Sequence, residues 1–428
     1  MQRSPWGSCV LKRFFQKSEF GRNVVTLMTG TAIAQAIPIA VSPILTRLYS
    51  PSDFGVFAVY MAVTAVLSVI ATGRYEQVVM LPQKDEDAAN VVVLSLIVST
   101  LFSLILLLIV VIWNSPITAL LGNSEISGWL YLIPFSVLSM GAYNTFTYWL
   151  NRKKCFRAMS ANRIMQGSVT ASGQVFGGFW KTGPIGLIVS YVVGWIPAIY
   201  FAARSYNYKD YPISVSSVIA HAKLYKNYPV FSAPGALLDC ASVQAPVFFL
   251  TKGYETATVG FFSLAMRVLA APASIISTSI GQVFFQKISA LIHTDREKIP
   301  AEVLNTAKKL TVIAALIFLP FIIFGGDIFG FIFGEKWRIA GDYLIILAPA
   351  LFVRFIGSPL SNIFLATGNV RLCTLWQMLY FISSIIVMCI LIGSSIKLFL
   401  IGFVINEIVL HAVYFYLIII ASKRVIIR

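Results

Sequence analysis

Charged side chains are scarce in this sequence. Asp, Glu, Lys and Arg make up 12% of the 428 residues, whereas soluble domains carry about 25%. So few charges cannot cover a water-exposed surface, while hydrophobic residues reach 58% of the chain. The composition therefore excludes an ordinary soluble protein and predicts a chain that folds in lipid.

Acidic residues, histidine and cysteine are also few. The sequence has 17 Asp and Glu against 33 Lys and Arg, 3 histidines and 5 cysteines. The cysteines show no CxxC spacing and the histidines do not cluster, so we expect no metal, no cofactor and no disulfide framework. The motifs GxxxxGK[ST], HExxH and GxSxG are absent, so we expect neither ATP hydrolysis nor another enzymatic activity.

Apolar segments long enough to cross a bilayer recur along the whole chain. About 20 helical residues span the roughly 30 Å of hydrocarbon. We therefore predict an all-α polytopic membrane protein with two six-helix bundles around a central cavity, one within residues 1–208 and the other within 209–428. The twelve or so expected spans are 24–46, 54–73, 90–113, 129–150, 164–180, 183–203, 229–251, 256–280, 309–333, 343–366, 371–392 and 397–421.

Basic residues between these spans predict the orientation. Most of the 33 Lys and Arg residues fall in the two termini and in alternate connections, among them 151–163, 204–228 and 281–308. Lys and Arg in short loops are enriched on the cytoplasmic side. Both termini should therefore be cytoplasmic, and the net charge of +16 indicates membrane topology rather than nucleic-acid binding.

An internal repeat joins the two halves. TRLYSPSDFGVFAVYM (46–61) aligns with TKGYETATVGFFSLAM (251–266), with identical Thr, Tyr, Gly, Phe and Met. Both segments lie at the turn between the first two spans of a half and on the same membrane side. This pattern is typical of parallel repeats related by an axis along the membrane normal, as in transporters that use alternating access.

Two arginines, Arg267 and Arg354, lie inside predicted spans. An ionisable side chain at bilayer depth costs at least about 2.5–3.5 kcal/mol, so each needs a partner or a watery cavity. Either they line a cavity where a guanidinium holds a phosphate or carboxylate, or each is a structural arginine paired with a neighbouring carbonyl or acid. Polar residues at helical spacing share their faces: Ser263 and Ser274 with Arg267, and Ser358 and Asn362 with Arg354.

Three further cations lie near the ends of spans. Arg47, Arg74 and Lys252 either contribute to the same cationic lumen or extend to the membrane interface. Among the acids, Asp239, Glu407 and Glu76 are the candidates for coupling to H⁺ or Na⁺, and the alternative is that they neutralise an arginine.

Several segments resemble bacterial oligosaccharide flippases of the polysaccharide-export branch, the O-antigen type, of the multidrug/oligosaccharidyl-lipid/polysaccharide superfamily. The resemblance covers residues 22–420 and rests on the following stretches: SPILTRLYSPSDFGVFAVY (42–60), RYEQVVMLPQKDEDAANVVVLSL (74–96), YWLNRKKCF (148–156), YKNYPVFSAPGALLD (225–239), VGFFSLAMRVLAAPASIISTSIGQVF (259–284) and FGEKWRIAGDYLIILAPALFVRFIGSPLSNIF (333–364).

This resemblance implies a function. It implies translocation of an undecaprenyl-pyrophosphate-linked sugar repeat unit to the periplasmic leaflet of the inner membrane by alternating access, driven by an ion gradient. A cationic lumen would hold the pyrophosphate, and Arg267 and Arg354 lie within matching segments. The expected partners are the lipid-linked oligosaccharide, membrane lipid, a polysaccharide polymerase and a chain-length regulator, and we expect a monomer.

Three other classes of function fit this sequence less well. A drug or cation exporter of the same superfamily would need acids rather than arginines in its cavity. A membrane sugar polymerase or ligase usually carries a large external loop, whereas the longest one expected here is 114–128. A structural scaffold would have no reason to hold charge at bilayer depth.

Overall fold

The structure is a computed structural model that describes residues 19–206, 211–367 and 369–427. Helices account for nearly all of these ranges, and no β-strand occurs in them. The predicted all-α membrane fold is confirmed. Helices suit lipid because they satisfy their backbone hydrogen bonds within one segment.

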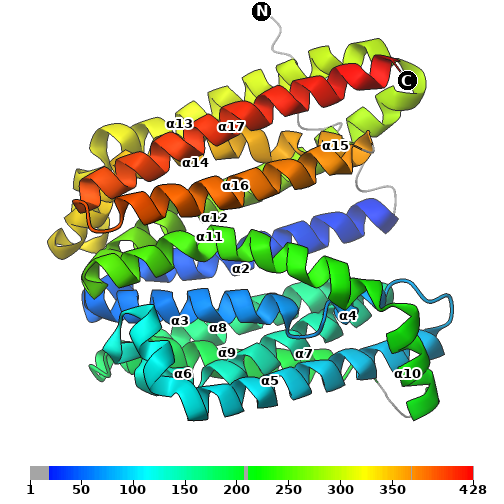
Figure 1. The fold of residues 1–428 in the computed structure, drawn as a ribbon, viewed down its shortest axis with the longest axis horizontal. Coiled ribbons are helices and arrows are strands. Elements are labelled where there is room, and N and C mark those ends of the chain that lie inside the picture. The colour runs from blue at the N-terminus through cyan, green and yellow to red at the C-terminus, as the bar shows by residue number, and fades with distance from the viewer. Residues whose placement is uncertain (1–18, 207–210, 368, 428) are drawn as a thin grey trace, which may run out of the picture. The chain divides into compact units, whose positions relative to one another are not determined.

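The helices follow the predicted spans closely (Figure 1). The first half contains α2 (Glu19–Leu48), α3 (Pro51–Ile70), α4 (Tyr75–Val78), α5 (Asp85–Leu121), η1 (Ser124–Ile126), α6 (Ser127–Leu130), α7 (Ile133–Arg152), α8 (Phe156–Phe179) and α9 (Pro184–Ala203). After α10 (Val215–Leu224), the chain continues through η3 (Tyr228–Ser232), α11 (Ala233–Gly253), α12 (Thr256–Thr294), η4 (Arg296–Lys298), α13 (Ile299–Phe333), η5 (Glu335–Trp337), α14 (Arg338–Leu360), α15 (Asn362–Ala366), α16 (Val370–Leu391) and α17 (Ile396–Ile427).

Ten of the described helical segments are long and apolar enough to cross a membrane. The bent pair Ser124–Leu130 and Ile133–Arg152, with an angle of 54° between its parts, makes eleven when it is counted as one span. The sequence predicted about twelve spans because it also counted residues 164–180, which lie in α8. This helix carries Asn162, Arg163 and Gln166, which keep it less apolar than the other spans.

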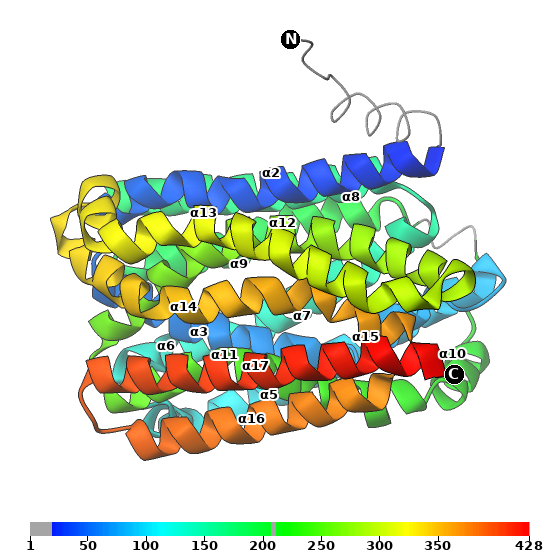
Figure 2. The same cartoon turned by 90° about the horizontal axis from the view of Figure 1, so that it is seen from above.

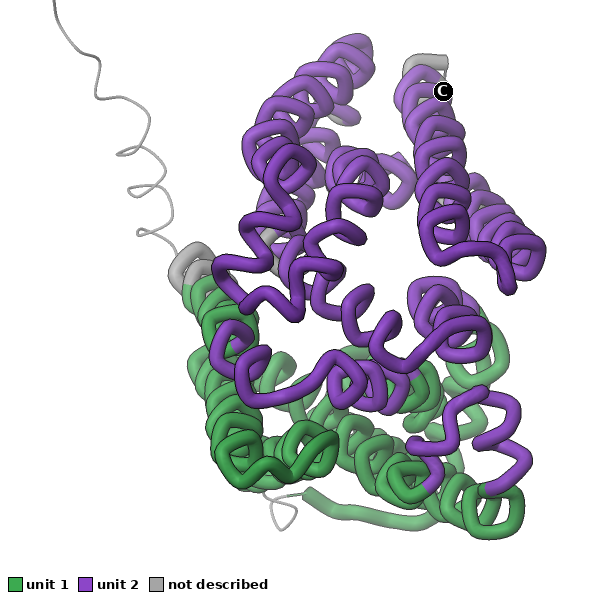
Figure 3. The backbone as a smooth tube through the Cα atoms, turned by 90° about the vertical axis from the view of Figure 1, so that its left-hand side faces the viewer, with its two compact units in different colours: residues 1–41, 63–114, 128–237 green, residues 42–62, 115–127, 238–428 purple. Residues whose placement is uncertain are grey.

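The chain forms two compact units (Figure 3). Unit 1 contains residues 1–41, 63–114 and 128–237, and unit 2 contains residues 42–62, 115–127 and 238–428. The predicted division between residues 208 and 209 lies outside the described residues. The connection that carries α10 belongs to unit 1, since the last boundary falls after Leu237.

The two copies of the sequence repeat touch each other within unit 2. A Cβ atom on Gly55 would lie 2.0 Å from the carbonyl oxygen of Thr256, and one on Gly260 would lie 1.9 Å from the carbonyl oxygen of Pro51. Gly55 aligns with Gly260 in the repeat, and Pro51 aligns with Thr256. Each copy therefore presents the same glycine to the same position of the other copy, which is the pattern of a two-fold contact.

Short helices between spans complete this contact. In η5, Trp337 donates a hydrogen bond from Nε1 to the carbonyl oxygen of Thr46 at 2.8 Å. In the loop before η1, Asn123 donates from Nδ2 to the hydroxyl of Thr256 at 3.2 Å. A connection in the second half thus binds the repeat segment of the first half, and a connection in the first half binds the repeat segment of the second half. These contacts explain why residues 42–62 and 115–127 belong to unit 2.

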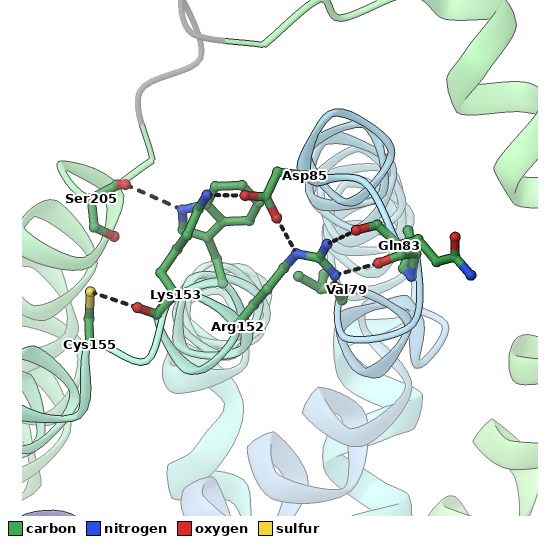
Figure 4. A network of polar contacts seen from close by, with 9 residues as sticks. Val79, Gln83, Asp85, Arg152, Lys153, Cys155 and Ser205 are labelled. Atoms are coloured by element: carbon green, nitrogen blue, oxygen red, sulfur yellow. Dashed lines mark hydrogen bonds and ion pairs between the residues drawn. The ribbon is translucent and has the colours of Figure 1, made fainter. Parts of the chain in front are cut away.

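Three connections of unit 1 meet at one end through a polar network (Figure 4). Arg152 donates to the carboxylate of Asp85 at 2.8 Å and to the carbonyl oxygens of Val79 and Pro82 at 3.1 and 2.8 Å. Lys153 pairs with the same carboxylate. The indole of Trp149, a buried residue, donates to the carbonyl oxygen of Ser205 at 3.3 Å. The connections after α3, α7 and α9 therefore share a side, as the alternation of spans predicts.

Candidate functional site

Arg354 lies near the middle of α14, a span of unit 2. Together with Glu407 of α17 and Met266 of α12, it lines a small cavity of about 10 Å³. A cavity of that size holds about one water molecule. Arg354 makes neither a hydrogen bond nor an ion pair with another described residue, and its charge acts on Tyr380 and His411.

Glu407 is almost completely buried, with 1% of its surface exposed. Its carboxylate accepts a hydrogen bond of 2.5 Å from the hydroxyl of Tyr380 on α16. The Nδ1 atom of His411, one helical turn further along α17, lies 3.5 Å from the other carboxylate oxygen and 2.9 Å from the Glu407 carbonyl oxygen. The cluster thus joins α14, α16 and α17, and Figure 2 shows α16 and α17 running side by side.

Aromatic side chains surround this cluster. The ring of Trp376 stacks on Tyr414 with centroids 3.9 Å apart, and its Nε1 donates to the carbonyl oxygen of Leu410 at 3.2 Å. The neighbouring Asn406 is also bonded, since its Oδ1 accepts from Ser383 at 2.6 Å. A buried carboxylate in lipid is tolerated when such partners satisfy it.

Arg267 lies on α12 and is half-buried. Its Cζ atom lies over the ring of Phe57, 5.7 Å from the centroid. It makes no ion pair with a described carboxylate. The small cavity beside Arg354 is lined by Met266, the residue before Arg267, and not by Arg267 itself.

The predicted polar positions around the arginines form mainly local contacts. Ser263 donates to the carbonyl oxygen of Val259 within α12 at 2.7 Å. Ser274 and Ser358 are exposed. Asn362 is different, because its Nδ2 donates to the carbonyl oxygen of Gly281 at 3.1 Å and links α15 to α12.

The cations at the ends of spans are not part of the Arg354 cluster. Arg47 is exposed and donates to the carbonyl oxygen of Pro43 in its own helix at 3.3 Å. Lys252, which aligns with Arg47 in the repeat, is exposed in the last turn of α11, beside Gly122.

Arg74 and Glu76 form a separate pair in unit 1. Arg74 Nη1 lies 3.7 Å from Glu76 Oε1, and the hydroxyl of Thr72 donates to the same carboxylate. Arg74 has a positive φ of 64° and a buried Nε with no partner among the described residues. Burial raises the pKa of the Glu76 carboxyl above its ordinary value, although Thr72 and Arg74 oppose that rise.

Asp239 is exposed on α11 and makes no ion pair with a described residue. It lies close enough to Tyr380 and Tyr414 for its charge to act on them. Asp239 and Glu407, both predicted candidates for ion coupling, therefore lie toward the same group of helices in unit 2.

Two residues of the Glu407 cluster, and the position of Arg163, were not predicted from the sequence. Tyr380 and His411 contact Glu407, and only His411 had a signal, since it lies four residues after Glu407. Arg163 was predicted in a loop, but α8 begins at Phe156, so Arg163 lies inside the helix and donates to the hydroxyl of Thr31 at 2.7 Å. No group of three or more His, Cys, Asp or Glu in the described ranges has the arrangement of a metal site.

Solved structures of several transporters share this fold. The lipid II flippase MurJ in an inward closed conformation matches with a TM-score of 0.71 at 15% identity, over 92% of this chain and 87% of that one. An inward-facing multidrug resistance MATE transporter of the MOP superfamily matches with a TM-score of 0.67 at 13% identity, over 91% and 95%. A MOP superfamily transporter from Pyrococcus furiosus gives 0.63 at 14% identity, over 99% of each chain. The chain has the fold of MOP superfamily transporters.

The family follows from the sequence itself. The polysaccharide biosynthesis protein family model matches residues 44–341, and the chain belongs to this family. The succinoglycan biosynthesis transport protein ExoT of Rhizobium meliloti (strain 1021) is 23% identical over 315 residues, which make up 72% of this chain and 61% of that relative. The chain thus spans about three-fifths of the relative's length. The predicted family resemblance is confirmed, and the protein is a multi-pass membrane protein with the fold of these transporters.

Proposed function

We propose that this protein is a flippase that moves undecaprenyl-pyrophosphate-linked oligosaccharide repeat units across the bacterial inner membrane by alternating access. The family membership and the fold shared with a lipid II flippase support a lipid-linked sugar as the cargo. Such a cargo carries a charged head group that must leave water, so it needs fixed positive charge inside the protein.

The proposal rests mainly on the position of the Arg354 guanidinium. Arg354 lies within the candidate span Glu335–Ala366 beside a water-sized cavity and has no ion pair with a described residue. A guanidinium presents five donors in a planar fork that matches phosphate oxygens. Arg267 supplies a second such group, held over Phe57. These two arginines are the proposed ligands of the pyrophosphate.

Ion coupling forms the second part of the proposal. Glu407 lies between Tyr380, His411 and the cavity of Arg354, so a proton on Glu407 would change the charge that Arg354 faces. Asp239 and Glu76 are the other candidates. The coupling ion is H⁺ or Na⁺, and collapse of a proton gradient in proteoliposomes distinguishes them.

Orientation and partners complete the proposal. Both termini face the cytoplasm, and the flippase works as a monomer beside a polysaccharide polymerase and a chain-length regulator. Tagging a terminus and testing its accessibility in spheroplasts checks the orientation. A tag that extracellular protease removes would contradict it.

The central experiment is deletion of the gene followed by analysis of lipid-linked intermediates. We expect undecaprenyl-pyrophosphate-linked repeat units to accumulate in the cytoplasmic leaflet, and the wild-type chain to restore surface glycan. Accumulation in the periplasmic leaflet would instead indicate a step after translocation. Unchanged intermediates would contradict the proposed cargo.

A further inference from the structure

The connecting helix α10 lies across one end of unit 1 (Figure 1). It runs crosswise to the long axes of α5 and α7 in that view. One face of α10 packs on the unit, since Val218 belongs to the buried cluster that contains Tyr75 and Trp149. The helix is therefore part of the folded unit rather than a free linker.

Polar contacts fix α10 in this position. The side chain of Asn90 on α5 donates to the carbonyl oxygen of Pro212 and accepts from the backbone N–H of Ser214, both at 3.1 Å. The hydroxyl of Tyr75 donates to the carbonyl oxygen of Ala222 at 3.1 Å. His221 Nε2 lies 3.6 Å from the carboxylate of Asp87.

The side of α10 next to its packed face exposes apolar side chains. Val215 is 76% exposed, Ile219 50% and Leu224 67%, and Ile213 just before the helix is 40% exposed. Val215 and Ile219 are one helical turn apart, so they form a stripe along the helix. A contiguous apolar stripe on a surface marks a site of interaction.

The stripe lies in a connection between two candidate membrane spans. The span α9 ends at Ala203, and the next candidate span begins at Tyr228. In that next span Phe231 is 72% exposed, so the apolar surface continues from the connection into lipid-facing helix. We therefore expect a helix held between two such ends to lie at the depth of the lipid head groups.

Positive charge borders the stripe. Lys223 and Lys226 are exposed, and neither forms an ion pair with a described carboxylate. Two of the three acids at the nearby start of α5 have partners, since Asp85 pairs with Arg152 and Lys153 and Asp87 faces His221, while Glu86 is exposed. Lysines beside an apolar stripe attract anionic lipid head groups.

We propose that the exposed stripe of α10 formed by Val215, Ile219 and Lys223, together with Lys226 in the turn after the helix, is a binding surface for anionic phospholipids. The apolar side chains enter the boundary between head groups and acyl chains, while the lysines contact the phosphates. Because α10 is bonded to α5 and to Tyr75, the bound lipid holds unit 1 at one leaflet.

A fluorophore on α10 tests this surface. Ile219→Cys, made in a full-length chain whose native cysteines are replaced by serine, carries bimane on the exposed face. The protein is placed in nanodiscs of equal parts phosphatidylcholine and phosphatidylglycerol, with a nitroxide on the upper acyl chain of one lipid or the other. We expect quenching several-fold stronger from the anionic lipid, and a smaller difference at high salt.

Charge variants separate this recognition from simple proximity to lipid. Lys223→Gln and Lys226→Gln should each lower the quenching ratio by up to about fivefold. Lys181→Gln, which changes an exposed lysine between α8 and α9, should leave it unchanged. An unchanged thermal unfolding temperature shows that each variant is folded.

Three results would overturn the proposal. Equal quenching by the two lipids would remove the preference for anionic head groups. Quenching by aqueous iodide, with none from either lipid, would place the stripe in water or against a soluble protein. A disulfide between two copies of the Ile219→Cys variant would make a second copy of the chain the occupant. None of these readouts depends on sugar transport, so the proposed flippase function stands or falls separately.

Discussion

Gly55 and Gly260 occupy equivalent positions of the sequence repeat, and each lies against the other copy of the repeat. A Cβ on Gly260 would also lie 3.1 Å from the backbone nitrogen of Gly55. The two glycines therefore meet close to the local two-fold axis that relates the two copies. Backbone approaches this close require glycine because a side chain has no room to move aside.

Alanine at either glycine should therefore destabilise the protein. In Gly55→Ala and Gly260→Ala the new Cβ meets backbone carbonyl oxygens that no rotamer change can remove. We expect a loss of about 1–3 kcal/mol of stability, measured as a lower unfolding temperature in detergent. Gly128→Ala is the control, since nothing lies within 4 Å of its Cβ position. A control as unstable as the two variants would contradict the steric reason.

Removing the guanidinium of Arg354 should stop glycan export without loss of the protein from the membrane. Charge-assisted hydrogen bonds are worth about 1.5–3 kcal/mol, so Arg354→Ala should lower export by about 10- to 100-fold. Arg354→Lys should restore only part of it, because an ammonium lacks the planar fork. Surface glycan and membrane protein level are measured together. The exposed Arg157→Ala is the control, and full export by Arg354→Ala would remove the site assignment.

Tyr380 should act through Glu407. Tyr380→Phe leaves the buried carboxylate without the hydroxyl that donates to it at 2.5 Å, which should cost about 1–3 kcal/mol of stability. The double variant Tyr380→Phe/Glu407→Gln should be less destabilised than the sum of the single ones, because one contact is lost in both. Tyr416→Phe, with the ring 64% exposed, is the control. Additive effects would show that the two side chains are not coupled.

Glu76 should make stability depend on pH. Burial raises its pKa above the ordinary 4.5, so the folded protein holds this proton more tightly than the unfolded chain. Its contribution is fully present below 4.5 and is lost as the pH rises through the folded pKa. Glu76→Gln should flatten the stability profile in that window, whereas the exposed Glu86→Gln should not. An unchanged profile in Glu76→Gln would place the dependence on another group.

The sequence predicted the helices well because lipid imposes a length and an apolarity on each span. It also predicted that the two repeat copies occupy equivalent places, and the contact between Gly55 and Gly260 agrees with that symmetry. Helix ends were less predictable. Arg163 looked like a loop residue because α8 is rich in polar side chains.

The candidate site was predictable only in part. A mid-span arginine such as Arg354 is visible in the sequence, because a charge at that depth is expensive. Its surroundings are not, since Tyr380 and Glu407 come from different helices and meet only after these pack. Nothing in the spacing showed that Met266, rather than Arg267, borders the cavity.

The reciprocal contact of the two repeats has an evolutionary reading. One half of the chain alone would leave its glycine turn uncovered, whereas two copies of one half would cover each other through the same pair of approaches. The arrangement is thus what a duplicated gene would retain from an ancestral homodimer, with the covalent connection replacing the encounter of two separate chains.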